Sequence, residues 1–209
     1  MRFIDLSHPL TDGQHAFPGD PILNIRDHST TASESRCNIS HIEMGSHQGT
    51  HLDSMFHFIS SGKTLDQMPL EWFYGPARVL RIPKAADEEL DVEDFLPFEE
   101  FLVPEAKIIY QTGWSSEFKE HHYFTDFPSL TIDASRFLAE KGIRMLGMDT
   151  PTPSRDYYES HHILLGKEIV IVESLTNLEQ LPDEFIFCGF PLNFVGRDGS
   201  PIRAVGMVP

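Results

Sequence analysis

The sequence predicts an α/β protein, because segments with strand and helix patterns alternate along it. Short apolar runs at residues 106–113 and 168–175 are typical of buried strands. Residues 129–142 form the clearest helix pattern, with apolar side chains at Ile132, Phe137 and Leu138 and a glycine at 142 that can end the helix. The pattern does not reveal the number of sheets.

The other elements follow in chain order. Residues 3–13 predict a short strand and a turn, and the FPGDP run at 17–21 adds a second turn. Alternating apolar residues at 37–46 predict a strand that leads into the segment beyond it. We further expect strands at 75–83, 143–149 and 184–192, a short helix within 86–106 and a helical segment at 161–167.

The composition indicates one domain spanning residues 1–209, long enough to bury a substantial core. A net charge of −16 opposes binding to nucleic acid or to anionic membrane surfaces, which both need a basic footprint. Cys37 and Cys188 are expected to be free packing residues, which favours a reducing, cytoplasmic setting. The N-terminus lacks a signal-peptide pattern, and we expect no membrane span.

The stretch HQGTHLDSMFH at residues 47–57 concentrates His47, His51, Asp53 and His57. Neutral imidazoles and carboxylates are ligands for divalent first-row metals. In an extended segment these odd-numbered residues would all point to one side, and Gly49 between them would leave space for an ion or substrate. The alternative is that these side chains only cover a solvated strand face. That alternative would account for a single histidine, but it accounts less well for three histidines and an aspartate spaced so that all four share one face. The stretch therefore predicts a metal site.

The second half of the chain offers further ligands. His161 precedes an apolar segment, and Glu173 interrupts the run IVIVESL. A carboxylate in a buried strand is costly unless it is paired or bound to metal. We expect both residues to join the site, with an ion pair between Glu173 and an arginine as the alternative. We expect His162 to be a neighbour of the site and not a ligand.

The run HQGTHLDSMFHF resembles the HxGTHxDxxxHF signature of the cyclase-type metal-dependent hydrolases, a family that includes bacterial kynurenine formamidases and isatin hydrolases. The resemblance extends over most of the chain. The N-terminal part of the family is similar to IDLSHPLTDGQHAFPGDP in this chain. Its second half is similar to HHILLGKEIVIVESLTNL, and its C-terminal part is similar to GRDGSPIRAVGM.

This resemblance implies a swivelling β/β/α domain and a set of residue roles. His47, His51 and Asp53 would bind a first metal ion, and Asp53 would bridge to a second ion held by His161 and Glu173. His57 would stay off the metal as general acid and base. Family membership also implies one or two ions of zinc or manganese, a small-molecule substrate and a homodimer or homotetramer.

The chemistry expected is hydrolysis of a carbon–nitrogen bond in a small amide, formamide or lactam, with a metal-activated water as nucleophile. Hydrolysis of a lactone or ester at the same site is one alternative, and a non-catalytic metal-binding protein is another. Many relatives carry proline two residues after the aspartate, where this chain has Met55. That departure makes formylkynurenine a less secure substrate, and the substrate-binding residues are not identified.

Overall fold

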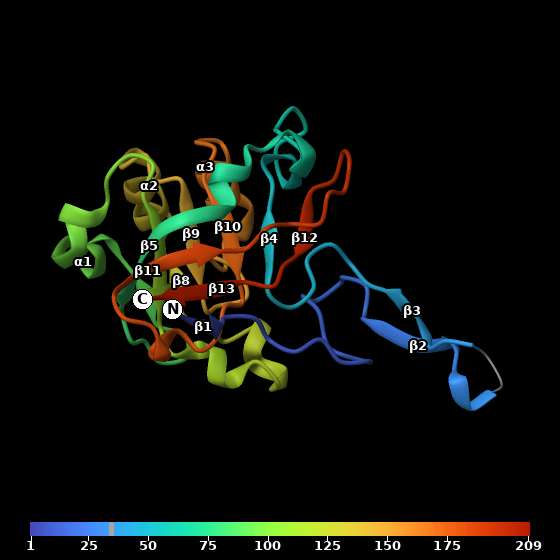
Figure 1. Cartoon of the computed structure of the whole chain (residues 1–209). Coiled ribbons are helices and arrows are strands. Elements are labelled where there is room, and N and C mark those ends of the chain that lie inside the picture. The colour runs from blue at the N-terminus through green and yellow to red at the C-terminus, as the bar shows by residue number, and fades with distance from the viewer. Residues whose placement is uncertain (34–35) are drawn as a thin grey trace.

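A computed structural model describes residues 1–33 and 36–209 and confirms the mixed α/β class (Figure 1). Its main element is a nine-stranded sheet. In spatial order the strands are β1 (Arg2–Asp5), β13 (Val205–Val208), β11 (Glu184–Cys188), β5 (Tyr74–Arg81), β7 (Lys107–Gln111), β9 (Met145–Met148), β10 (Val170–Glu173), β4 (His51–Asp53) and β12 (Gly199–Pro201).

The centre of this sheet is parallel and buried. Strands β5, β7, β9 and β10 run parallel, whereas β4 pairs antiparallel with β10 and with β12. Every residue of β9 and β10 is buried, as expected for parallel strands covered on both faces. Glu173 is therefore a carboxylate at the end of a buried strand.

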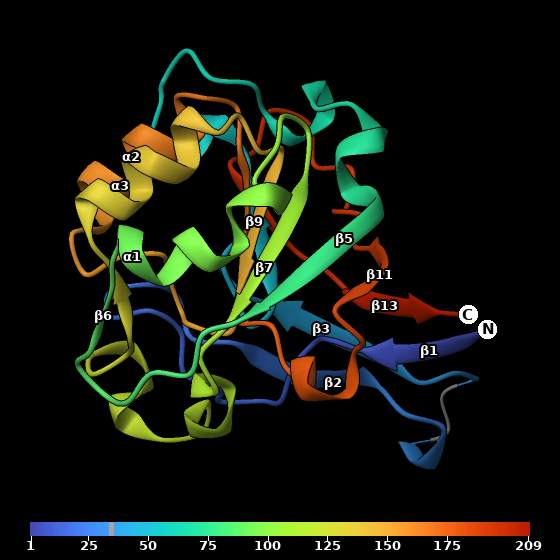
Figure 2. The same cartoon turned by 90° about the vertical axis from the view of Figure 1, so that its left-hand side faces the viewer.

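Helices cover one side of the sheet (Figure 2). They are α1 (Val92–Phe95), α2 (Ile132–Glu140) and α3 (Tyr157–Leu165), and α2 packs against α3. Thr131 caps α2 by accepting a hydrogen bond from the backbone amide of Ala134 at 3.0 Å, which satisfies a free helix N–H. Helix α3 begins with the Asp156 cap and carries His161 on its buried side.

Two further sheets, each of two strands, occur among the residues with a described structure. Strands β6 (Glu89–Leu90) and β8 (Ser129–Leu130) pair in parallel near the helices. Strands β2 (Asn24–Ser29) and β3 (Ile39–Glu43) form an antiparallel hairpin that projects away from the body (Figure 1). Every residue of β3 is exposed.

Most of the expected elements are confirmed, but the extended conformation of residues 47–57 is wrong. Only His51–Asp53 is a strand, and Met55–His57 is a turn of 3-10 helix. Gly49 has φ of +61°, a left-handed conformation that turns the chain between His47 and His51. The side chains converge through a turn, a strand and a helical turn, and not through a common strand face.

Two further expectations concern the chain as a whole. In the portion of the chain with a described structure, no helix has the length and apolar character needed to cross a membrane. Both cysteines are free, as expected. The packing role is wrong for Cys37, which is exposed, while Cys188 is partly buried in β11.

Candidate active site

The structure brings the predicted metal ligands of the two halves together. His51 and Asp53 lie on β4, and Glu173 ends β10, the neighbouring strand. His51 Nε2 lies 3.2 Å from Glu173 Oε2, and His161 Nε2 from α3 lies 3.4 Å from Asp53 Oδ2 and 3.5 Å from Glu173 Oε1. Glu173 therefore faces two histidines and not an arginine.

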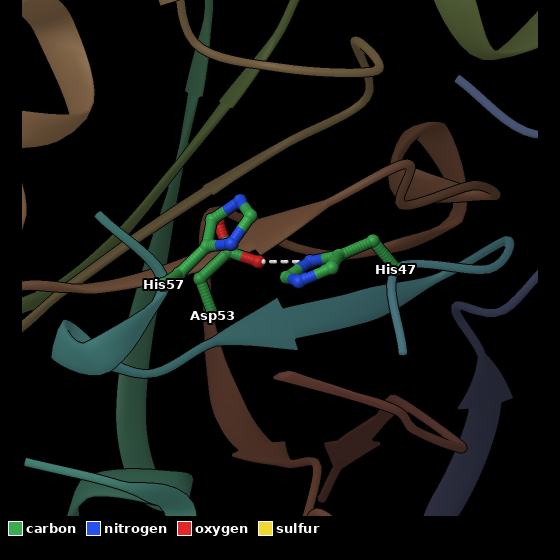
Figure 3. Close-up of side chains that lie close together, drawn as sticks. All are labelled: His47, Asp53 and His57. Carbon is green, nitrogen blue, oxygen red and sulfur yellow. Dashed lines mark hydrogen bonds and ion pairs between the residues drawn. The ribbon is translucent and has the colours of Figure 1, made fainter. Parts of the chain in front are cut away.

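His47 reaches the same cluster from the loop before β4. Its Nδ1 lies 2.9 Å from Asp53 Oδ1, and its ring lies 5.1 Å from that of His51. Figure 3 shows the Asp53 carboxylate next to the imidazoles of His47 and His57, with its contact to His47 drawn as a dashed line. Asp53 is thus the carboxylate that all parts of the cluster share.

Backbone contacts fix the ring nitrogens of two histidines. Nδ1 of His51 lies 2.8 Å from the carbonyl oxygen of Gly49, and Nδ1 of His161 lies 2.7 Å from that of Tyr157. A carbonyl only accepts, so Nδ1 carries hydrogen in both rings. In the neutral form each Nε2 then presents a lone pair toward the carboxylates, as in metal-binding histidines held by a hydrogen bond at the other nitrogen.

Three polar atoms at the centre of the cluster are buried and lack a hydrogen-bond partner among the residues that the structure describes: His51 Nε2, Asp53 Oδ2 and Glu173 Oε1. Two adjacent buried carboxylates are costly without compensating positive charge. Neutral imidazole nitrogens and carboxylate oxygens together suit a divalent first-row metal. The donor set therefore fits a metal ion.

Among the residues that the structure describes, two sets of three side chains each offer donor atoms that lie within 4.8 Å of one another, and Asp53 belongs to both sets. One set combines Asp53 with His161 and Glu173, as expected for a second ion. The other combines Asp53 with His47 and His57, whereas the sequence assigned His51 to this ion and kept His57 apart. His51 Nε2 lies 3.6 Å from Asp53 Oδ1, so it also remains within reach of the first ion.

The electrostatics of the metal-free cluster follow from its burial and its carboxylates. Burial disfavours charge on His47, but Asp198 and Asp53 outweigh it and raise the pKa of His47 to about 10. In the same way Asp53 and Glu173 raise the pKa of His161 to about 9 despite its burial. The surrounding histidines hold the pKa of the Glu173 carboxyl below its usual value, although burial acts in the opposite direction.

His57 has the opposite electrostatic character. Its ring stacks on that of His47, with centroids 3.9 Å apart and planes inclined by 28°. Burial, helped by the neighbouring imidazoles and opposed by Asp53, lowers the pKa of His57 to about 4. His57 is therefore neutral near pH 7, as a proton acceptor must be.

A cavity of about 270 Å³ opens over the cluster. Its lining includes His51, His57, His161 and Glu173. Aromatic side chains form much of its wall: Phe17, Phe58, Phe118, Phe124 and Tyr157. Phe58 stacks on His161 with ring centroids 4.4 Å apart. The cavity suits a small, largely apolar ligand.

Asp198 and Gly199 are among the residues of this site that sequence reasoning missed. Asp198 Oδ2 lies 2.7 Å from His47 Nε2, and a Cβ on Gly199 would lie 2.5 Å from His47 Cε1. The sequence signal for both residues is the run GRDGSP at 196–201, which resembles the C-terminal part of the family but does not by itself indicate a contact with His47. His162 lies beside the site as expected, with Nδ1 bonded to the carbonyl of Tyr158.

Comparisons with known proteins show which sequences and structures this chain is similar to. The Cyclase family model ("Putative cyclase") matches residues 4–155. Kynurenine formamidases of Bacillus mycoides and Bacillus cereus are each 30% identical over 208 residues, covering 98% of this chain and 96% of theirs.

Solved structures share the fold. Isatin hydrolase A from Labrenzia aggregata has a TM-score of 0.88 and 27% identity, covering 99% of this chain and 93% of its own. A potential metal-dependent hydrolase with cyclase activity has a TM-score of 0.82 and 25% identity, covering 98% of this chain and 96% of its own. The chain therefore belongs to the Cyclase family of metal-dependent hydrolases.

Proposed function

We propose that this chain hydrolyses a carbon–nitrogen bond in a small amide, either an arylformamide such as N-formylkynurenine or a lactam such as isatin. The observation that carries the proposal is that buried donor atoms of His51, Asp53 and Glu173 converge beside a cavity lined by aromatic residues. Within the described residues these three atoms have no hydrogen-bond partner. The similarity to kynurenine formamidases and to an isatin hydrolase supports a carbon–nitrogen bond as the one that is cleaved.

In this proposal His47, His51 and Asp53 hold one divalent ion, and Asp53, His161 and Glu173 hold a second. Zinc or manganese is the ion implied by the resemblance. When bound, the metal supplies Lewis-acid chemistry that polarises the substrate carbonyl and acidifies water. The fixed Nε2 lone pairs of His51 and His161 and the shared carboxylate of Asp53 support this assignment.

His57 is the proposed general acid and base. Its neutral ring accepts a proton from the attacking water as the oxygen adds to the carbonyl carbon. The same ring then donates that proton to the leaving nitrogen as the carbon–nitrogen bond breaks. The acid product releases the remaining proton of the water to solvent, so the products are a carboxylate and an amine. These are formate and an arylamine for a formamide, or a ring-opened amino acid for a lactam.

The aromatic wall supplies the proposed binding surface for the substrate. Phe17 and Tyr157 pack edge to face at 5.7 Å, and Phe58 lies 6.3 Å from Tyr157. A planar aryl group can bury apolar surface against these rings and exclude water from His57.

Substitution of His57 tests the mechanism. We expect His57→Ala to lower kcat by about 10²- to 10⁴-fold while metal content stays unchanged, because only proton transfer is lost. The matched control is His41→Ala, an exposed histidine on β3. Full turnover in His57→Ala with metal retained would refute the proposed role.

A substrate panel separates the alternatives. Metal-dependent hydrolases can cleave esters as well as amides. The values of kcat/KM should therefore be compared for an N-formyl arylamine, isatin and a matched aryl lactone. The lactone reacting best would favour the ester alternative. Retained metal with no turnover on any carbonyl substrate would favour a non-catalytic metal-binding protein.

We further propose a single catalytic domain in a homodimer or homotetramer, placed in the cytoplasm. The resemblance to the family supports the assembly, and the two free cysteines support a reducing compartment. Light scattering on the purified chain measures the assembly directly.

A further inference from the structure

Asp198 contacts His47 on the side away from Asp53. Its Oδ2 atom lies 2.7 Å from His47 Nε2 and accepts a second hydrogen bond, at 2.9 Å, from Ser46 Oγ. About a third of the Asp198 side chain is exposed, so this carboxylate lies at the rim of the buried cluster. Charge-assisted hydrogen bonds of this length are among the stronger ones in proteins.

Backbone contacts fix the position of Asp198 relative to β4. The amide of Ser54 donates to the Asp198 carbonyl oxygen at 2.8 Å, and Gly199 pairs in register with Asp53. The absent side chain of Gly199 leaves the space that the His47 ring occupies. The chain at 198–199 therefore forms a cradle for this imidazole.

The two nitrogens of His47 have different partners. Nδ1 faces Asp53 Oδ1 at 2.9 Å, and Nε2 faces Asp198 Oδ2 at 2.7 Å. A neutral imidazole has one N–H and one lone pair. When Asp198 accepts the hydrogen of Nε2, the lone pair lies on Nδ1 and points toward Asp53. His51 and His161 have the reverse arrangement, in which Nδ1 is bonded and Nε2 is free.

The same carboxylate oxygen also lies near the proposed acid and base. His57 Nδ1 is 4.0 Å from Asp198 Oδ2, and the His57 ring stacks on that of His47. A rotation of the His47 ring would therefore disturb both the metal-side donor and the surface that supports His57.

We propose that Asp198 is a positioning residue that holds His47 in the Nε2–H tautomer and presents its Nδ1 atom to a divalent cation. This inference rests on the proposed metal-dependent function. It assigns His47 a donor atom that differs from those of His51 and His161. It also explains why a carboxylate and a glycine are adjacent in the GRDG run.

The test compares metal binding in four proteins: the wild type, Asp198→Ala, Asp198→Asn and Ser46→Ala. Dissociation constants for zinc come from competition with a chromophoric chelator, and cobalt-substituted samples give visible absorption spectra that report ligand geometry. Circular dichroism of the metal-free proteins shows which variants fold. Ser46→Ala is the matched control, because it removes the other hydrogen bond of Asp198 and leaves His47 untouched.

We expect Asp198→Ala to weaken zinc binding by about 10- to 100-fold, as is typical for loss of a carboxylate behind a metal-binding histidine, and to change the cobalt spectrum. Asp198→Asn keeps an oxygen that can accept from Nε2–H, so it should retain the wild-type spectrum and lose about 3- to 10-fold in affinity. Ser46→Ala should stay within about 3-fold of the wild type, because its lost bond does not reach the metal site.

Wild-type affinity and an unchanged spectrum in Asp198→Ala would overturn the positioning role, as would an equal loss in Ser46→Ala. If Asp198→Ala does not fold, unchanged affinity in Asp198→Asn overturns it instead. A wild-type protein that binds no zinc or cobalt would refute the proposed function itself. If the wild type binds zinc normally and the Asp198 variants bind it with the same affinity, only this inference is refuted.

Discussion

The Nε2 atom of His51 lies 3.2 Å from Oε2 of Glu173, and the two residues are direct partners in the register of antiparallel strands β4 and β10. The hydrogen bonds of the sheet therefore set the distance between donors from opposite halves of the chain. A site built on such strands is held more rigidly than one built on loops. The spacing of these two donors is thus set by the backbone of the sheet.

Gly199→Ala should weaken metal binding without a large loss of stability. Gly199 has φ outside the left-handed region, so alanine fits its backbone, but the added Cβ would lie 2.5 Å from His47 Cε1. The imidazole must move, and we expect at least about tenfold weaker zinc binding, as for other losses of support behind a metal ligand.

Gly45→Ala is the control for this substitution. Its Cβ would lie 3.4 Å from Pro21 Cδ, an ordinary contact near the same loop. Chelator competition measures the affinity of both variants. Equal affinity in Gly199→Ala and the wild type would show that the cradle for His47 tolerates a side chain.

Met55→Pro should preserve the fold and the metal site. Met55 is the first residue of its 3-10 helix, and Ser54 before it is already extended, with φ of −88° and ψ of 166°. Proline is tolerated at a first helical position, and the residue before it must be extended. The cost is the lost methionine side chain, which is 2% exposed.

We expect Met55→Pro to lower the free energy of unfolding by about 1 to 3 kcal/mol, less than a full truncation to alanine. Met55→Leu, which conserves volume, should cost less than about 1.5 kcal/mol. Urea unfolding and metal content check both variants. Loss of metal from a folded Met55→Pro protein would mean that the methionine itself maintains the site.

Metal binding should release protons, and its apparent affinity should rise with pH. In the metal-free protein the pKa of His47 is about 10 and that of His161 is about 9, so both rings are protonated at pH 7. A metal ion needs the neutral ring and must displace these protons. Affinity should therefore increase from pH 7 until the pH passes these values, where proton release should cease.

Calorimetric titration with zinc in two buffers of different ionisation enthalpy gives the number of protons released. We expect about two per fully loaded chain at pH 7 and fewer near pH 9.5. His41→Ala should release the same number as the wild type, because this exposed histidine lies on the projecting hairpin. A pH-independent affinity with no proton release would contradict the protonated state of the cluster.

The sequence predicted the core elements and the residues that converge at the site better than it predicted the path of the chain. Runs such as 168–175 and 129–142 have local apolar patterns that define a strand and a helix, and both are present. The extended geometry considered for residues 47–57 does not hold throughout, because Gly49 adopts a left-handed conformation that pattern alone does not reveal.

Asp198 was missed for a different reason. Its relation to His47 depends on the pairing of β12 with β4, a contact between residues distant in sequence. An aspartate before glycine in a polar run is also typical of an ordinary turn. Only the folded chain shows that its carboxylate faces an imidazole of the cluster.

The most direct test of the account is metal content per chain, measured by mass spectrometry on protein purified without chelator or an affinity metal. His51→Ala and Glu173→Ala are measured beside the wild type, with His162→Ala as a control that neighbours the site. The account predicts zinc or manganese at one or two ions per chain in the wild type and the control, with loss of bound metal in both other variants. A metal-free wild type, or metal content indifferent to both substitutions, would contradict it.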